Sequence, residues 1–146
     1  MARQPRSCRN ASLDLLARRE HSRFELIRKL KDRDFSLQEI EVTLDALEAE
    51  NLQSDARYAE AFARQRAQKG NGANRIRYEL KERGIDDELI IMALEPWQDQ
   101  WLEIAARQHE KRFGKQPEDV KERARQTRYL QSRGFGFDII RQIISD

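Results

Sequence analysis

One short segment of this sequence occurs three times at a spacing of fifty residues, and each copy has the form of one helix ending and another beginning. The copies read KLKDRDFSLQEI from residue 29, ELKERGIDDELI from residue 79 and YLQSRGFGFDII from residue 129. Three residue types coincide in all copies: Leu30, Leu80 and Leu130; Arg33, Arg83 and Arg133; Ile40, Ile90 and Ile140. A period of this size is typical of stacked supersecondary units that bury a continuous core. The chain is therefore predicted to fold as an array of three similar units.

Helix start and stop signals flank these segments. Two S-x-x-E capping boxes precede predicted helices of the first unit, Ser22 with Glu25 and Ser36 with Glu39. Gly84 and Gly134 stand where a left-handed residue ends a helix, and Asp34 fills that place in the first copy with less conformational freedom. Pro117 is expected at the first position of the eighth helix, where the missing N–H of proline costs no hydrogen bond.

The fold class follows from these signals. Further apolar residues with helical spacing lie upstream of each copy, near residues 12–20, 55–69 and 98–113. Only six glycines and three prolines leave little room for a β-sandwich. We predict an all-α protein of three tandem three-helix repeats with a period of about fifty residues. The expected divisions are a disordered basic arm at 1–10 and repeats at 11–52, 53–95 and 96–146.

Composition adds limits on compartment. The 28 basic and 26 acidic residues give a net charge of +2, which by itself selects no class of partner. Cys8 is the only cysteine, so no intramolecular disulfide can form and a reducing cytosol fits; we expect it to be a bystander thiol in the arm. The arginines of the first ten residues are followed by no apolar run, and no stretch approaches transmembrane length. A cytoplasmic protein without a membrane segment is expected.

Signals for catalysis are missing from the sequence. His21 and His109 stand in no metal-binding spacing, and both are expected to be solvated surface residues. No Walker or dinucleotide-binding glycine motif occurs, and the glycines of KGNGAN do not follow a strand. No serine or cysteine has a context that suggests an activated nucleophile. We therefore predict a protein that is not an enzyme and holds no cofactor and no metal.

The distribution of charge is more informative than its sum. Residues 64–83 contain seven bases against two acids, whereas residues 12–50 contain seven bases against ten acids. A polarised surface of this kind suits nucleic acid or a mixed-charge partner, although helices merely solvated by mixed charge would look similar. The candidate partner- or DNA-binding residues are Arg64, Arg66, Lys69, Arg75, Arg77, Tyr78, Lys81, Lys111, Arg112, Arg125 and Arg128.

Some of the remaining side chains have structural interpretations. The arginines of the repeated turn occupy the last turn of their helices, where they can bind the free end carbonyls. Tyr78 is predicted to point away from the core, either to stack on a base or on a partner, or to pack on the neighbouring unit. Trp97 and Trp101, one turn apart, are expected in the core of the third unit.

The run from LLARREHSRF to AFARQR, followed by NRIRYELKERGID and YLQSRGF, resembles the RecX family of bacterial recombinase regulators. The most specific parts are R-E-H-S at 19–22, D-x-R-Y-A at 55–59 and R-I-R-x-E-L-x-x-x-G-I at 75–85. The resemblance covers nearly the whole chain after the N-terminal arm. Asp34 departs from the family's usual glycine, and Ser54 stands where a second aspartate is common.

The resemblance implies a function and a shape. Family members bind RecA filaments on single-stranded DNA, lie along the filament groove, and restrain ATP hydrolysis, strand exchange and LexA cleavage. It also implies an elongated, curved body, wound to the right or to the left, that acts as a cytoplasmic monomer and binds DNA weakly without sequence preference. Two alternatives stay open: a helix-turn-helix protein that reads duplex DNA directly, and a helical-repeat adaptor for protein partners only.

Overall fold

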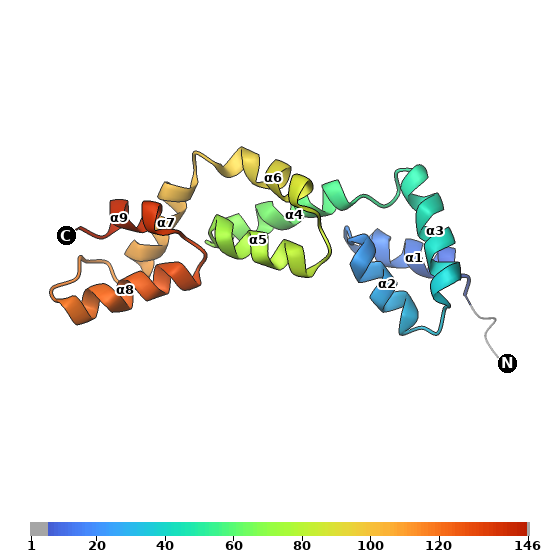
Figure 1. Cartoon of the computed structure of the whole chain (residues 1–146), viewed down its shortest axis with the longest axis horizontal. Coiled ribbons are helices and arrows are strands. Elements are labelled where there is room, and N and C mark those ends of the chain that lie inside the picture. The colour runs from blue at the N-terminus through green and yellow to red at the C-terminus, as the bar shows by residue number, and fades with distance from the viewer. Residues whose placement is uncertain (1–5, 146) are drawn as a thin grey trace.

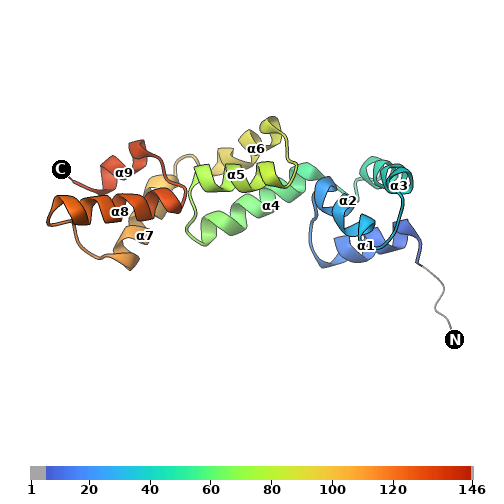
Figure 2. The same ribbon diagram turned by 60° about the horizontal axis from the view of Figure 1, so that its bottom comes forward.

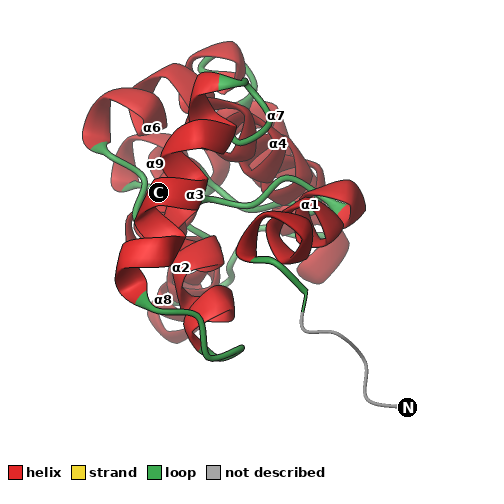
Figure 3. Cartoon of the chain, turned by 90° about the vertical axis from the view of Figure 1, so that its right-hand side faces the viewer, coloured by secondary structure: helices red, strands yellow, loops and turns green. Residues whose placement is uncertain are grey.

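The computed structural model describes residues 6–145, and this part of the chain is helical with no strand (Figure 3). The elements in chain order are α1 (Cys8–Arg18), α2 (Arg23–Lys31), α3 (Leu37–Ala49), α4 (Asp55–Gln68), α5 (Ala73–Glu82), α6 (Asp87–Leu94), the short 3₁₀ helix η1 (Glu95–Trp97), α7 (Trp101–Arg112), α8 (Val120–Ser132) and α9 (Phe137–Ile143).

Consecutive helices form three units that follow one another along an elongated body (Figure 1). Within the units, α2 packs on α3, α4 on α6 and α7 on α9. The second helices α2, α5 and α8 lie in a row on one side of the body, and α3, α6 and α9 lie above them along the upper edge of Figure 2. The predicted all-α array of three three-helix units is confirmed.

The repeated turn has the same backbone geometry in each unit. The left-handed residue is Asp34 at φ 68°, Gly84 at 77° or Gly134 at 102°. The next N–H donates to the leucine carbonyl five residues earlier: Phe35 to Leu30 at 3.2 Å, Ile85 to Leu80 at 3.1 Å and Phe135 to Leu130 at 3.1 Å. This bond closes the helix end as in a Schellman motif. The same six-residue turn therefore ends the second helix of all three units.

Two of these turns need glycine for a second reason. A Cβ on Gly84 would lie 2.6 Å from Cβ of Phe24, and a Cβ on Gly134 would lie 2.5 Å from Cβ of Arg75. Each turn thus touches the second helix of the preceding unit at backbone distance. Asp34 belongs to the first unit and has no preceding unit to touch, so it needs only to tolerate a positive φ, which Asp does better than most residues.

The buried side chains form two separate cores. Unit one has its own core, around Leu26, Leu30, Ile40, Leu44 and Leu47. Units two and three share one core, which runs from Tyr58 to Ile144 and includes Leu80 and Leu130. The repeat leucines at positions 30, 80 and 130 are all 0% exposed, so their predicted burial is confirmed. Trp101 belongs to the shared core and Trp97 packs against it, half-buried.

The capping predictions are largely confirmed. Ser22 and Glu25 form both bonds of a capping box at the start of α2. Ser36 Oγ accepts the Glu39 N–H at 3.2 Å at the start of α3, which is half of that motif. The prediction for Pro117 is wrong: α8 begins at Val120, capped by Asp119, and the proline lies in the preceding loop.

The prediction of a disordered arm over 1–10 is wrong for its last residues. α1 begins at Cys8, and Cys8 is 2% exposed in the core of unit one, not a bystander thiol. Arg9 forms two hydrogen bonds to the Glu50 carboxylate, at 2.8 and 2.9 Å, which ties α1 to the end of α3. Residues 1–5 of the expected arm lie outside the described residues. The boundaries at 52/53 and 95/96 stay predictions.

Candidate partner interface

The predicted basic residues of unit two lie on α4 and α5, but they are not equivalent. Glu79, whose side chain is 13% exposed, lies 2.9 Å from Nη2 of Arg66 and 3.4 Å from Nε of Arg75. The Arg66 guanidinium also stacks on Phe62, 5.0 Å from the ring centroid. The Arg66 guanidinium therefore holds α4 to α5, and its charge is largely neutralised by Glu79.

The other candidate cations of unit two form weaker ion pairs or none with the described residues. Lys81 lies 3.3 Å from Asp87 and Arg64 lies 3.9 Å from Glu60, both at exposed sites where such pairs contribute little. Lys69 and Arg77 are exposed and pair with no carboxylate among the described residues; Arg77 donates to the Asn74 side chain at 2.8 Å. The charges most available in unit two are thus those of Lys69 and Arg77.

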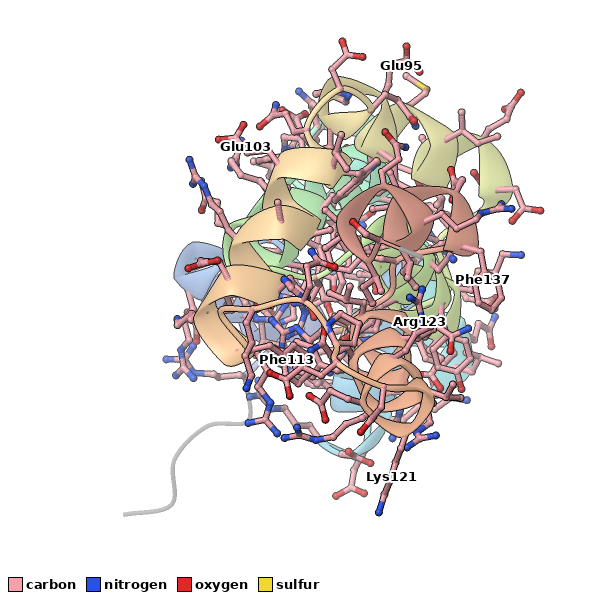
Figure 4. All side chains as sticks on the ribbon, turned by 90° about the vertical axis from the view of Figure 1, so that its left-hand side faces the viewer. Glu95, Glu103, Phe113, Lys121, Arg123 and Phe137 are labelled. Carbon is pink, nitrogen blue, oxygen red and sulfur yellow. The ribbon has the colours of Figure 1, made fainter. Side chains whose placement is uncertain are left out.

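Two of the candidate cations of unit three lie over a pair of aromatic rings. Phe113 and Tyr129 meet edge to face at 5.4 Å, with Arg125 over the first ring at 5.3 Å and Arg112 over the second at 5.4 Å. Figure 4 shows Phe113 between α7 and α8. Arg125 also pairs with Glu122 at 3.1 Å. Lys111 and Arg128 are exposed and form no ion pair with a described residue.

Tyr78 points into solvent, with 64% of its surface exposed. A hydrogen bond with Glu82 raises the pKa of its phenol. Of the two predictions for this residue, packing on the neighbouring unit is wrong, and an open aromatic face beside Arg77 and Lys81 is what the structure has. Such a face can stack on a nucleic-acid base.

The sequence reasoning missed the basic side chains of unit one. Arg28 and Lys31 are exposed on α2, which lies in the same row as α5 and α8 (Figure 2). Four exposed acids of this unit lie on α3, above α2 in Figure 2: Glu39, Glu41, Asp45 and Glu48. The repeat itself held the signal, because Arg28, Tyr78 and Arg128 occupy the same register fifty residues apart.

The turn arginines act differently in each unit. Arg83 donates to the Glu79 carbonyl at 2.9 Å, as predicted for the end of its own helix. Arg133 instead reaches unit two, where it donates to the carbonyls of Lys69 at 2.6 Å and Gly70 at 3.4 Å. Arg33 is exposed. The prediction therefore holds for Arg83, while Arg133 binds the end of another helix.

Two of the specific motifs interlock across the boundary between units one and two. The Arg57 Nε lies 3.0 Å from the Glu20 carboxylate, and the Arg23 N–H donates to Asp55 at 2.8 Å. Gln53 donates to the His21 carbonyl at 3.3 Å. The R-E-H-S and D-x-R-Y-A segments are thus the two sides of one polar clasp.

A cavity of about 390 Å³ lies beside this clasp. Tyr58 lines it, and burial together with the nearby Glu25 carboxylate raises the pKa of its phenol to about 12. Glu25 in turn accepts two hydrogen bonds from the Arg19 guanidinium, at 3.1 and 3.0 Å. Both carboxylates that line the cavity are already paired, Glu20 with Arg57 and Glu25 with Arg19. The lining residues come from units one and two, so the cavity belongs to the joint between these units.

Both histidine predictions are wrong. His21 is 1% exposed: its Nδ1 lies 3.1 Å from the Arg19 carbonyl and its Nε2 lies 2.9 Å from the Lys29 ammonium. The Nδ1–H therefore donates to the carbonyl while Nε2 accepts from Lys29, and burial lowers the pKa of the ring. His109 is 6% exposed and its Nε2 lies 2.7 Å from the Gln126 side-chain oxygen. Each buried imidazole is stabilised by a hydrogen bond to a side chain on another segment, Lys29 for His21 and Gln126 for His109.

Residues 6–145 contain no cluster of His, Cys, Asp and Glu that could hold a metal ion. Within the same residues, no helix is both long enough and apolar enough to span a bilayer.

Comparison with known proteins matches all three units. Family models described as the first, second and third three-helix domains of RecX match residues 8–47, 54–94 and 98–144. Regulatory protein RecX of Chromohalobacter salexigens is 43% identical over 145 residues, which is 99% of this chain and 95% of that one. Regulatory protein RecX of Pseudomonas putida (strain GB-1) is 44% identical over 142 residues, 97% of this chain and 91% of that one.

Solved structures agree with the fold. The crystal structure of RecX from Lactobacillus salivarius superposes with a TM-score of 0.81 at 27% identity, covering 93% of this chain and 91% of that one. A second crystal structure of regulatory protein RecX gives a TM-score of 0.82 at 25% identity, covering 93% of this chain and 70% of that one.

Proposed function

Because this chain belongs to the RecX family of regulatory proteins, we propose that it is a negative regulator of the RecA recombinase. It binds RecA filaments on single-stranded DNA and lowers ATP hydrolysis, strand exchange and LexA cleavage by RecA. It acts in the cytoplasm as a monomer, without catalysis of its own.

The observation that best supports this proposal is the row of second helices. α2, α5 and α8 belong to three successive units and lie in a row on one side of an elongated body (Figure 2), and each carries exposed basic residues. A surface of this length suits a regularly repeating polyanion, and phosphate contacts bring affinity without sequence preference. Binding to bare DNA is accordingly weak and unspecific.

Direct reading of duplex DNA is the less favoured function. A recognition helix places its N-terminal side chains on base edges in the major groove. α6, the third helix of unit two, begins with Asp86, Asp87 and Glu88, all exposed. Phosphates on either side of a groove would repel this end of the helix.

The proposal is tested by titrating the purified chain into RecA turning over ATP on single-stranded DNA. Turnover should fall at substoichiometric amounts, and the chain alone should hydrolyse no nucleotide. Turnover that stays constant across a wide titration would refute the regulatory role while leaving the fold untouched.

The basic row is tested by charge removal. Arg28, Lys31, Arg77 and Arg128, which are exposed on α2, α5 and α8 and pair with no described carboxylate, change together to Gln. The matched control changes Arg64, Arg75, Lys81 and Arg125, which have carboxylate neighbours. Losing four phosphate contacts should flatten the log–log salt dependence of single-strand binding by roughly 3. The control should flatten it less. Equal slopes for the wild type and the first variant would remove these residues from the interface.

A further inference from the structure

α6 is the one third helix that is apolar over most of its circumference and yet open on its outer side. Ile90 and Leu94 face the core at 1% and 2% exposure, whereas Ile91 and Met92 are 63% and 66% exposed. A helix that is hydrophobic all round is normally covered all round. Adjacent exposed Ile and Met side chains mark a surface suited to being covered by a partner.

Acidic side chains frame these two residues along the helix. Glu88 lies one turn before them and Glu95 one turn after, both exposed, and neither forms an ion pair with a described residue. Asp87 is paired with Lys81 at the edge. The patch of Glu88, Ile91, Met92 and Glu95, here called the α6 patch, therefore combines apolar area with two carboxylates that lack a counterion.

The other third helices do not repeat this combination. In the fifty-residue register, Glu41 and Val42 on α3 stand where Ile91 and Met92 stand on α6, and Arg141 and Gln142 stand there on α9. The α6 patch is thus particular to the middle unit, which lies at the centre of the elongated body (Figure 1).

The patch faces away from the basic row. In the view along the body in Figure 4, Glu95 lies at one side and Lys121, on α8, lies at the opposite side. A chain that binds phosphates through α5 and α8 therefore leaves the α6 patch turned outward, free to contact something other than nucleic acid.

We propose that the α6 patch docks onto a protein surface that carries basic side chains around an apolar area. This inference rests on the proposed function: the partner is the RecA that coats single-stranded DNA in the filament. Burial of Ile91 and Met92 supplies affinity at the centre of the contact, and the two carboxylates select a basic surface. The basic row and the α6 patch then divide the contact between nucleic acid and protein.

The test compares two forms of one fluorescent single strand, bare and coated with RecA held by a slowly hydrolysed ATP analogue. The variants are Ile91→Ser with Met92→Ser, and Glu88→Lys with Glu95→Lys. The matched controls are Val120→Ser, an 83% exposed apolar residue at the start of α8, and Glu103→Lys with Glu110→Lys, an equal charge change on α7. All seven substituted positions are exposed, so melting midpoints should stay within about 2 °C.

Each α6 patch variant should bind the coated strand at least about tenfold more weakly and the bare strand as the wild type does, while the controls bind both forms normally. Normal binding of both patch variants to the coated strand overturns the docking proposal and leaves the proposed function standing. A wild type that does not bind the coated strand overturns both. Self-association of the wild type that the patch variants abolish assigns the patch to a second copy of this chain and also overturns the proposal.

Discussion

The two boundaries between units are built in opposite ways. Units two and three share one apolar core, and their backbones are joined where the Gly72 N–H donates to the Arg133 carbonyl at 2.7 Å and the Asn74 N–H to the Gly134 carbonyl at 3.0 Å. Unit one has a separate core, and side chains such as Arg57 and Glu20 hold it to unit two, 3.0 Å apart. A sequence repeat thus makes similar units without making similar joints.

The difference predicts unequal strengths. Opening the second boundary would expose apolar side chains and break backbone hydrogen bonds, which costs free energy. The partly exposed ion pairs of the first boundary can be replaced by bonds to water at little cost. Units two and three should therefore unfold as one body, and unit one should open at lower free energy.

The largest effect should come from core truncation. Leu30→Ala and Leu130→Ala remove equivalent side chains, both 0% exposed, and each should cost about 2–5 kcal/mol. Hydrogen exchange should speed up only in α1–α3 for the first variant but throughout α4–α9 for the second. Faster exchange over the whole chain in both variants would mean that the first boundary is as cooperative as the second.

The turn glycines compare the two joints directly. An alanine at Gly134 would meet the Arg75 backbone N at 2.7 Å as well as its Cβ, whereas an alanine at Gly84 would meet only the side chain of Phe24. Gly134→Ala should cost about 3 kcal/mol and Gly84→Ala about 2 kcal/mol in urea unfolding, because strain at positive φ adds to overpacking. A larger loss at Gly84 would reverse the ranking of the joints.

The clasp itself should contribute modestly. A double-mutant cycle on Arg57→Ala and Glu20→Ala should give a coupling of about 1 kcal/mol, since both side chains are about one-third exposed. The control pair Arg107 and Glu103, 2.7 Å apart but 77% and 66% exposed, should give about 0.4 kcal/mol. Coupling at the clasp above about 3 kcal/mol would show that the first boundary is not the weaker one.

Mild acid should loosen the first boundary selectively. Burial lowers the pKa of His21 below its ordinary 6.5, so the unfolded chain binds a proton more tightly than the folded one. The stability due to neutral His21 is therefore present above pH 6.5 and is lost as pH falls through the folded-state pKa. Hydrogen exchange in α1–α3 should be faster at pH 5.5 than expected from chemistry alone. His21→Gln should abolish this dependence; its persistence would point to another group.

The smallest effect concerns the turn that has no preceding unit. Asp34→Gly should stabilise unit one by a few tenths of a kcal/mol up to about 1 kcal/mol, because glycine relieves the positive φ of 68°. Thermal unfolding monitored on unit one measures it. A loss of stability would mean that the Asp34 side chain has a favourable role in the turn.

The sequence determined the architecture, because the information for it is local and periodic. Helix period, capping at Ser22 and the five-residue spacing of each turn leave a single class of solution, repeated three times. It also indicated that bases gather over residues 64–83 and near residues 111–128. What it hid were contacts between residues on different helices, such as His109 with Gln126, which makes a buried imidazole tolerable.

Only the tertiary structure decided which charges are available and how the units join. Arg66 and Lys69 look alike in the sequence, yet Arg66 is held by Glu79 and Phe62 while Lys69 is exposed. The need for glycine at positions 84 and 134, and its absence at Asp34, likewise follows from whether a preceding unit lies within reach. Free energies of pairing and packing depend on distances through space, and spacing along a chain fixes those distances only within one helix or turn.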